Sequence, residues 1–168
     1  VSNPQWYRTE QKCLRVAQRR VARRKKGGAN RRKAVATLQR QHERITNRRK
    51  DFLNKLALDM VQRYDRIAVE ELNVKGMSHN RHLSKSILDS GWSYFRQRLD
   101  DKAVEAGRLV VGVNPAYTSK TCSGCGMIFE GLTLSDRWVT CACGVSLDRD
   151  INAAHNILRA GQARWGLT

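Results

Sequence analysis

The sequence predicts an α/β protein in which a small module, held by four cysteines, is inserted before the last helix. Residues 7–26 and 30–64 repeat apolar side chains at three- and four-residue steps, the period of a helix. Two short apolar runs, Ile67–Glu70 and Leu109–Val113, are typical of strands and flank a third helical stretch. Residues 117–147 contain four of the five cysteines as two close pairs. Helix, strand, helix, strand, module and helix in this order indicate an α/β fold.

Positive charge is concentrated in the first third of the chain. The 168 residues carry a formal net charge of +17. Residues 1–50 contain 17 Lys and Arg against 2 acids, whereas residues 51–168 contain 15 against 13. Such a concentration of positive charge indicates a polyanionic partner, and nucleic acid is the usual one. No run of 18 apolar residues is present, so we expect no membrane partner, and no small-molecule substrate is indicated.

The first two helical stretches are expected to form a basic helical hairpin over about residues 7–64. Leu14, Ala17 and Val21 form a thin apolar stripe on the first, and Gly27-Gly28 ends it. A solvated charged face is the alternative interpretation, but such faces normally mix charges of both signs. The second stripe comprises Val35, Leu38, His42, Ile45, Arg49, Phe52, Leu56, Met60 and Tyr64, widened by Leu53 and Val61. The candidate nucleic-acid contacts are Arg19, Arg20, Arg23, Arg24, Lys25, Lys26, Arg31, Arg32 and Lys33.

The middle of the chain alternates strand and helix. The run Ile67–Glu70 predicts a strand, followed by a turn at Gly76 and a basic loop over residues 77–86. A helix is predicted from about Asp89 to Ala106, and Leu109–Val113 is expected to form a second buried strand. The apolar residues of that helix are spaced to lie on a sheet: Trp92, Phe95, Leu99 and Ala103.

The cysteine pairs predict a zinc ribbon. Zinc binds four tetrahedral ligands, and two short hairpins supply them as Cys122 with Cys125 and Cys141 with Cys143. A glycine follows each pair and permits a tight turn. The second pair is C-x-C, one residue tighter than the usual spacing, so weaker binding or a substitute ligand such as Asp148 remains an alternative. The apolar residues between the pairs are expected to give the ribbon a small core: Met127, Ile128, Phe129, Leu132, Leu134, Trp138 and Val139.

Two carboxylates stand where a metal-dependent nuclease needs them. Glu70 ends a predicted strand, and Asp150 lies in the first turn of the helix that Asp148 caps. Asp150 shares a helix face with Ala154 and Ile157, which directs it towards the core side. Carboxylates on a strand end and a nearby helix can hold two Mg²⁺ ions for phosphodiester hydrolysis. The alternative remains open that these acids only complement a helix dipole or face solvent. The histidines at 79, 82 and 155 carry no ligand spacing.

Seven segments in order resemble one family: NPQWYR, QRRVARRKKG, HERITNRRKDFLNKLA, IAVEELNVKGM, SGWSYFRQRL, SKTCSGCG and LDRDINAAHNIL. They are similar to the C-terminal, RuvC-like nuclease half of the TnpB/OrfB proteins of bacterial insertion sequences. That family consists of RNA-guided DNA endonucleases related to type V CRISPR effectors. The resemblance implies an RNase H-like (RuvC) fold lacking its first strands. It also implies a partial RuvC-like domain over 1–116, a zinc ribbon that binds target nucleic acid over 117–147, and the last RuvC helix and tail over 148–168.

The resemblance implies roles for particular residues. Glu70 and Asp150 would be two catalytic acids that bind Mg²⁺, and the four cysteines would be the zinc ligands. The basic hairpin would face guide RNA and the guide–target DNA duplex, contacting the backbone. The family's first catalytic aspartate belongs to an opening strand that does not precede Val1. We therefore expect a part of a longer protein, inactive by itself in guided cleavage, and working in the bacterial cytoplasm on the nucleoid.

Two other interpretations remain. In the first, the chain is a non-catalytic zinc-ribbon protein that binds nucleic acid, and the acids at 70 and 150 have no role in its function. In the second, it is a transcription- or ribosome-associated zinc ribbon, which explains the cysteines but leaves the LDRDINAA segment unexplained.

Overall fold

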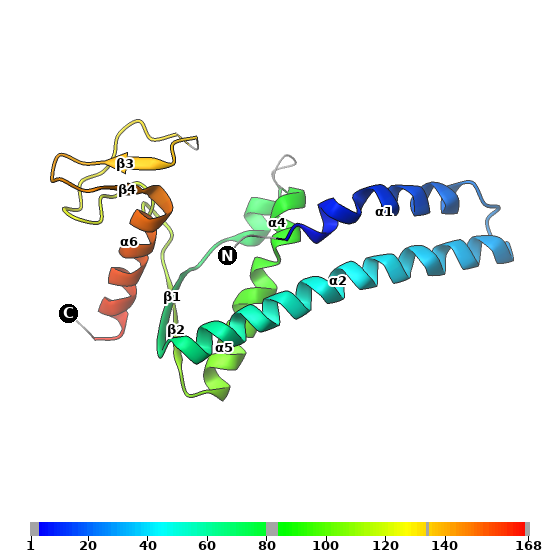
Figure 1. The fold of residues 1–168 in the computed structure, drawn as a ribbon, viewed down its shortest axis with the longest axis horizontal. Coiled ribbons are helices and arrows are strands. Elements are labelled where there is room, and N and C mark those ends of the chain that lie inside the picture. Colours follow the sequence, from blue (N-terminus) through cyan, green and yellow to red (C-terminus); the bar gives the residue numbers. More distant parts are fainter. Residues whose placement is uncertain (1–3, 80–83, 134, 167–168) are drawn as a thin grey trace. The chain divides into compact units, whose positions relative to one another are not determined.

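The computed structural model describes residues 4–79, 84–133 and 135–166. The chain divides into two compact units (Figure 1). The first unit comprises residues 1–62 and 73–102, and the second comprises residues 63–72 and 103–168. Leu134 and His82, which entered the predictions above, lie outside the described residues. Within the described ranges, no helix combines the length and apolar character that crossing a membrane requires.

Helices α1 (Trp6–Ala22) and α2 (Ala29–Arg63) of the first unit form the predicted hairpin. Figure 1 shows them side by side and antiparallel. Glu10 of α1 pairs with Arg48 of α2 at 3.4 Å, far from the connecting turn. Near that turn, the Arg31 guanidinium donates to the Val21 carbonyl at 2.8 Å. Contacts at both ends of α1 therefore fix the antiparallel register.

The predicted helix ends and stripes need two corrections. The first helix ends at Ala22 and not at Lys26, because the Arg31 side chain takes the carbonyls of Val21 and Arg24 that a longer helix would use. Of the predicted stripe on the first helix, Leu14 and Ala17 are buried and Val21 is half-buried. On α2, Ile45, Leu53 and Val61 of the predicted stripe are buried, together with Ala34 and Ala57. His42 and Tyr64 are exposed, so the buried stripe is narrower than predicted.

The helix predicted from about Asp89 to Ala106 is confirmed as α5 (Trp92–Glu105), but its predicted start is wrong. A separate helix, α4 (Ser84–Ser90), ends just before Gly91. Gly91 has φ +67°, a left-handed conformation that breaks a helix. Leu99 and Ala103 are buried as predicted, but Trp92, directly after the break, is exposed.

The predicted turn and loop after Asn73 also differ from the structure. A short helix, α3 (Val74–Ser78), occupies the expected turn, and the Asn73 side chain accepts from the Gly76 N–H at 2.9 Å. The predicted basic loop over 77–86 is helical at both of its ends. The cap explains the helix, because an asparagine oxygen satisfies an N–H that the first turn leaves free.

The second unit contains a parallel strand pair. Strand β1 (Arg66–Glu70) pairs with β2 (Leu109–Val113), in a register running from Arg66 opposite Leu109 to Glu70 opposite Val113. An ion pair between Asp65 and Arg108 joins the two segments of the chain just before the strands begin. The strand β2 is buried only towards its end, since Val113 is 1% exposed and Leu109 is 53% exposed. Because the strands are parallel, their carboxyl ends, at Glu70 and Val113, lie at the same edge of the sheet.

Helix α6 (Arg149–Arg164) packs on this strand pair. A Cβ placed on Gly161 would lie 2.5 Å from the Ala68 Cβ and 3.6 Å from a Val111 methyl carbon. Glycine is therefore the residue that allows helix and strands to approach this closely. The remaining strands, β3 (Trp138–Thr140) and β4 (Ser146–Asp148), pair in an antiparallel manner directly before α6.

Replacing Gly161 by alanine should destabilise the second unit. Alanine gains about 1 kcal/mol of helix propensity, but a methyl group forced against Ala68 costs about 1–3 kcal/mol and cannot rotate away. We expect a lower urea midpoint, measured by circular dichroism. The exposed neighbour Gln162 provides the control, since Gln162→Ala removes no close contact. A G161A variant as stable as the wild type would contradict the close packing of α6.

Candidate functional site

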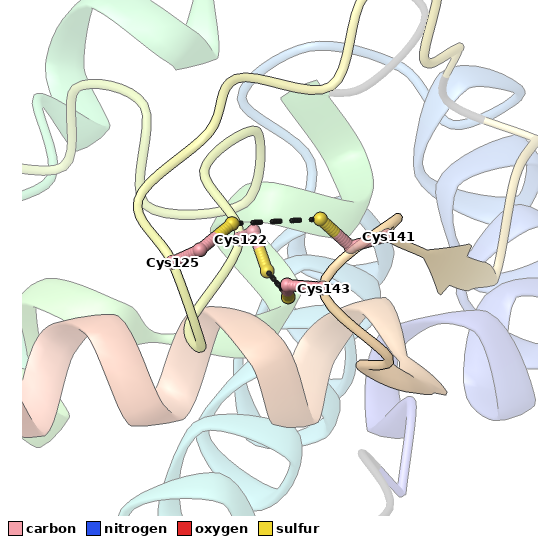
Figure 2. A group of neighbouring side chains, drawn as sticks. All are labelled: Cys122, Cys125, Cys141 and Cys143. Atoms are coloured by element: carbon pink, nitrogen blue, oxygen red, sulfur yellow. Dashed lines mark hydrogen bonds between the residues drawn. The ribbon is translucent and has the colours of Figure 1, made fainter.

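Four thiol groups converge in the second unit. Figure 2 shows Cys122 and Cys125 on one hairpin facing Cys141 and Cys143 on the other. All four sulfur atoms lie within 4.8 Å of one another, with Cys122–Cys143 at 3.6 Å and Cys125–Cys141 at 3.5 Å. A Zn–S distance of 2.3 Å in a tetrahedron places sulfur atoms about 3.8 Å apart. The cluster therefore fits a tetrahedral metal ion, and the structure brings the four predicted cysteines together.

Local backbone geometry explains why both hairpins close. The Gly126 N–H donates to the Cys122 carbonyl at 2.9 Å, and the Gly144 N–H donates to the Cys141 carbonyl at 3.0 Å. Both glycines have positive φ, at +81° and +94°. A Cβ on Gly124 would lie 3.2 Å from the Cys143 sulfur, so this residue also keeps the space between the hairpins open. The tight C-x-C pair thus directs both of its thiols into the cluster.

Hydrogen bonding makes one thiol of the cluster acidic. The backbone N–H of Cys125 is the main cause that lowers the pKa of Cys122 to about 6, with a smaller contribution from Gly124 and opposition from burial. The N–H of Cys143 acts to lower the pKa of Cys141, but burial and the neighbouring thiols together raise it to about 12. A thiolate is the form that binds a metal, so Cys122 is the sulfur most ready to bind.

The module has little apolar core of its own, contrary to the prediction. Met127, Ile128 and Trp138 are at least half exposed, whereas Val139 is buried. Cys122 and Cys141 occupy the interior instead, at 0% and 7% exposure. The cysteine cluster therefore takes the place that apolar side chains would fill in a larger module.

Asp148 serves the helix and not the metal cluster. Its Oδ1 accepts from the Asp150 N–H at 2.8 Å and from the Ile151 N–H at 3.3 Å. This is the predicted N-cap of α6. The alternative in which Asp148 replaces a cysteine ligand is not needed, since four thiols already converge.

Two asparagines of α6, which the sequence analysis did not single out, tie the first cysteine hairpin to the helix. Asn152 is fully buried; its Oδ1 accepts from the Ser123 N–H at 2.8 Å, and its Nδ2 donates to the Thr121 carbonyl at 2.7 Å. Asn156 donates to the carbonyls of Thr118 and Thr121, at 2.9 and 2.7 Å. Their four-residue spacing places them on one helix face. This spacing is the signal in the sequence that could have identified them as a pair.

Glu70 lies at the carboxyl end of β1, as predicted, and is half-buried. Its Oε1 accepts from the Thr118 hydroxyl at 2.5 Å. The adjacent Glu71 is exposed, and its side chain crosses the backbone of Gly112, where an added Cβ would clash with the Glu71 carboxyl group. The two glutamates are therefore held differently, and Glu70 is the one that contacts the loop leading to the cysteines.

Asp150 lies in the first turn of α6, eleven residues before Gly161. At 3.6 residues per turn these two positions share a helix face to within about 20°, and Gly161 packs on the strands. Asp150 is nevertheless exposed, as is Ala154, so the expectation that Asp150 points towards the core is wrong.

The predicted basic contacts gather at the turn of the helical hairpin. A cavity of about 560 Å³ lies at the end of α1 and just after it. It is lined by Val16 and four arginines: Arg19, Arg20, Arg23 and Arg24. Lys25, Lys26, Arg32 and Lys33 are exposed as well. Arg31 differs, because its guanidinium is half-buried and bonded to the Val21 and Arg24 carbonyls. Eight of the nine side chains are thus open to a partner, while Arg31 holds the turn together.

Two protein families match the chain. Residues 1–81 match OrfB_IS605, described as "Probable transposase". Residues 92–157 match "Cas12f1-like, TNB domain". The second match contains all four cysteines and Asp150, and the first contains the helical hairpin and Glu70.

Curated relatives cover nearly the whole chain. A Streptomyces pristinaespiralis protein named "Putative RNA-guided DNA endonuclease" is 41% identical over 97% of this chain and 41% of its own length. The Escherichia coli protein of the same name, InsQ, is 34% identical over 94% of this chain and 43% of its own length. The CRISPR-associated endodeoxyribonuclease Cas12f1 of Sulfoacidibacillus thermotolerans is 29% identical over 79% of this chain. The chain thus spans about two-fifths of the length of the first two.

The fold is similar to a solved one. The superposition on a Cas12f1 chain, from a cryo-EM structure of a complex with sgRNA and target DNA, covers 94% of this chain and 42% of that chain. The TM-score is 0.65 at 18% identity, which shows a shared fold.

The structure defines the chain as a mixed α/β protein with a four-cysteine module that can hold a metal ion. Within that class, the family matches and relatives are specific. The chain belongs to the TnpB/OrfB family of transposon-associated proteins.

We expect the purified chain to bind one metal ion through the four thiols. Cys122→Ser should lower the metal content well below one ion per chain and unfold the module, since metal binding contributes about 10–16 kcal/mol in small zinc folds. Metal analysis and the absorption spectrum of the cobalt-substituted chain measure this.

Cys13 supplies the matched control. It is an exposed cysteine of α1 and lies outside the cluster. Cys13→Ser should therefore leave the metal content at one ion per chain, and equal metal content in both serine variants would rule out the four-thiol site.

Proposed function

We propose that this chain forms part of an RNA-guided DNA endonuclease and supplies two acids of its Mg²⁺ site, a structural zinc ribbon and a basic surface for nucleic acid. The proposal rests on the family membership together with one structural observation. Glu70 is bonded to a loop that α6 fixes, and α6 carries Asp150 in its first turn.

The path of α6 along β1 supports a shared site for the two acids. Gly161 packs beside Ala68 in the middle of β1. Asn156, nearer the start of α6, bonds the Thr118 carbonyl, and the Thr118 hydroxyl bonds Glu70 at the end of β1. Moving towards the start of α6 therefore follows β1 towards its carboxyl end. Asp150 continues along this path, about 9 Å beyond Asn156 along the helix axis.

The exposure of Asp150 agrees with a metal-ligand role. A helix face that continues past the end of a strand pair has no strand beneath it, so its side chains remain free for solvent or ions. The Asp150 carboxylate accepts no hydrogen bond from any described residue. Carboxylates are the ligands that Mg²⁺ prefers. Two such ions would position a water molecule and stabilise the oxygens of an in-line phosphodiester displacement.

We assign zinc to the four-cysteine cluster, because tetrahedral thiolate sites are typical of structural zinc. The ribbon has few buried apolar residues, so the ion would supply most of its stability. The overall fold is proposed to be a RuvC-like, RNase H-type arrangement, and the protein is proposed to act on DNA in the bacterial cytoplasm.

A non-catalytic role in nucleic-acid binding is the second candidate. The exposed arginines and lysines around the helical hairpin turn favour it directly. It requires no role for Glu70 or Asp150. The two candidates therefore differ in what happens when the acids are neutralised.

Cleavage by a fusion protein tests the nuclease proposal. The residues that precede the matched region in the Streptomyces pristinaespiralis relative would be joined to residues 1–168 and combined with that relative's guide RNA, target DNA and Mg²⁺. We expect cleavage, with losses of at least about 100-fold on Glu70→Gln and Asp150→Asn, since each removes a metal-binding charge. Guide-RNA binding serves as the control and should stay unchanged.

The proposal would be refuted if the Glu70→Gln and Asp150→Asn variants cleaved DNA as efficiently as the unmodified fusion protein. It would also be refuted by a fusion protein that binds guide RNA but does not cleave the target. Residues 1–168 alone should leave the target intact, because the family resemblance assigns the first of three catalytic acids to an earlier strand. Efficient cutting by these residues alone would show that a third acid is not required.

Charge at the hairpin turn should control nucleic-acid affinity. Changing Arg19, Arg20, Arg23 and Arg24 to alanine should weaken binding and flatten the dependence of log affinity on log salt by about 0.9 per lost phosphate contact on duplex DNA. Fluorescence anisotropy from low to moderate salt measures the slope. Lysine substitutions at the same positions keep the charge and should retain most of the slope. An unchanged slope in the alanine variant would exclude this surface.

A further inference from the structure

The Thr118 hydroxyl lies between the cysteine module and the Glu70 carboxylate. Thr118 is 9% exposed, and its Oγ1 is 2.5 Å from Glu70 Oε1 and 3.1 Å from the Pro115 carbonyl oxygen. A hydroxyl group has one proton to donate. The bond to an ionised carboxylate is shorter and stronger than a bond to a neutral carbonyl. The proton therefore serves Glu70.

This bond fixes the orientation of the carboxylate. Oε1 is held by Thr118, whereas Oε2 accepts no hydrogen bond from the part of the chain that the structure describes. A metal ion can then approach the free oxygen without first displacing a protein donor. Hydrogen bonds of this kind commonly orient a ligating carboxylate.

Thr118 is itself held in place by α6. The Asn156 side chain donates to the carbonyl oxygens of Thr118 and Thr121, and Asn152 bonds Thr121 and Ser123. Ser123 follows Cys122, so these bonds run without interruption from the first cysteine hairpin to the residue that orients Glu70. Two asparagines that also belong to the helix of Asp150 thus fix the loop on both sides.

We propose that Thr118 is a positioning residue for Glu70, and that Asn152 and Asn156 hold it there by anchoring the loop from Thr118 to Ser123. This inference rests on the proposed role of Glu70 as a metal ligand. It assigns the cysteine module a role beyond holding a zinc ion, namely fixing a carboxylate of the Mg²⁺ site.

Paramagnetic nuclear magnetic resonance of the zinc-loaded 168-residue chain tests the proposal. Mn²⁺ replaces Mg²⁺ and broadens the signals of carboxylates that it binds. Glu70 and Asp150 signals should broaden in the wild type. Thr118→Val, which removes the hydroxyl but keeps the shape, should raise the Mn²⁺ concentration needed at Glu70 by about 10- to 100-fold, the usual effect of losing such a partner.

Three controls separate positioning from folding. Thr118→Ser keeps the hydroxyl and should bind Mn²⁺ nearly as the wild type does. Thr121→Val removes a neighbouring hydroxyl that bonds no described residue, since Thr121 forms its hydrogen bonds through its backbone N–H and carbonyl, and should change nothing. Zinc content and the amide signals of the cysteine hairpins should be the same in all variants. A slowly exchanging Thr118 hydroxyl proton close to Glu70 is expected in the wild type.

The outcomes are distinguishable. Wild-type broadening that T118V leaves unaltered would overturn the role of Thr118 but leave the proposed nuclease site standing. No broadening of Glu70 in the wild type would overturn both. If T118V does not fold, the absence of the slowly exchanging hydroxyl proton in the wild type would by itself overturn the role of Thr118.

Discussion

The structure of the second unit depends on Asn152, a polar side chain with no exposure to solvent. A buried amide is costly unless it is hydrogen-bonded, and both polar atoms of the Asn152 side chain are bonded, to Thr121 and Ser123 next to the first cysteine. The helix that carries Asn152 therefore packs only when the cysteine hairpin is correctly folded. The same helix packs on the parallel strands through Gly161. The parallel strands, α6 and the cysteine module therefore pack together as one unit.

This arrangement explains how a weakly apolar module can belong to a stable protein. The antiparallel strands β3 and β4 are three residues each, and most large side chains around them are exposed. Sulfur atoms and asparagine amides provide the interior that apolar groups do not. A metal ion that joins four thiols would therefore order a loop that reaches Glu70 through Thr118. Structural and catalytic ions would then be linked through a short series of hydrogen bonds.

Sequence patterns predicted most elements but not their junctions. Both long helices and both parallel strands were found within a few residues of their predicted limits, because repeated apolar positions report packing over many residues. Gly91 was missed as a helix break, since a single glycine is compatible with a helix and only its φ of +67° in the structure shows the break. The cysteines were found because a tetrahedral metal site requires closely spaced pairs of ligands. Thr118 was not found, because its partner Glu70 is 48 residues away.

Convergence of Glu70 and Asp150 on a shared metal ion is the idea on which the proposed nuclease function depends. Crystals of the zinc-loaded chain soaked in Mn²⁺ test it directly, because manganese can be located by its anomalous scattering. An ion bound by oxygens of both carboxylates, at about the 2.1 Å typical of Mg²⁺ sites, is the predicted result. Carboxylates directed to different faces of the unit, with no ion between them, would contradict it.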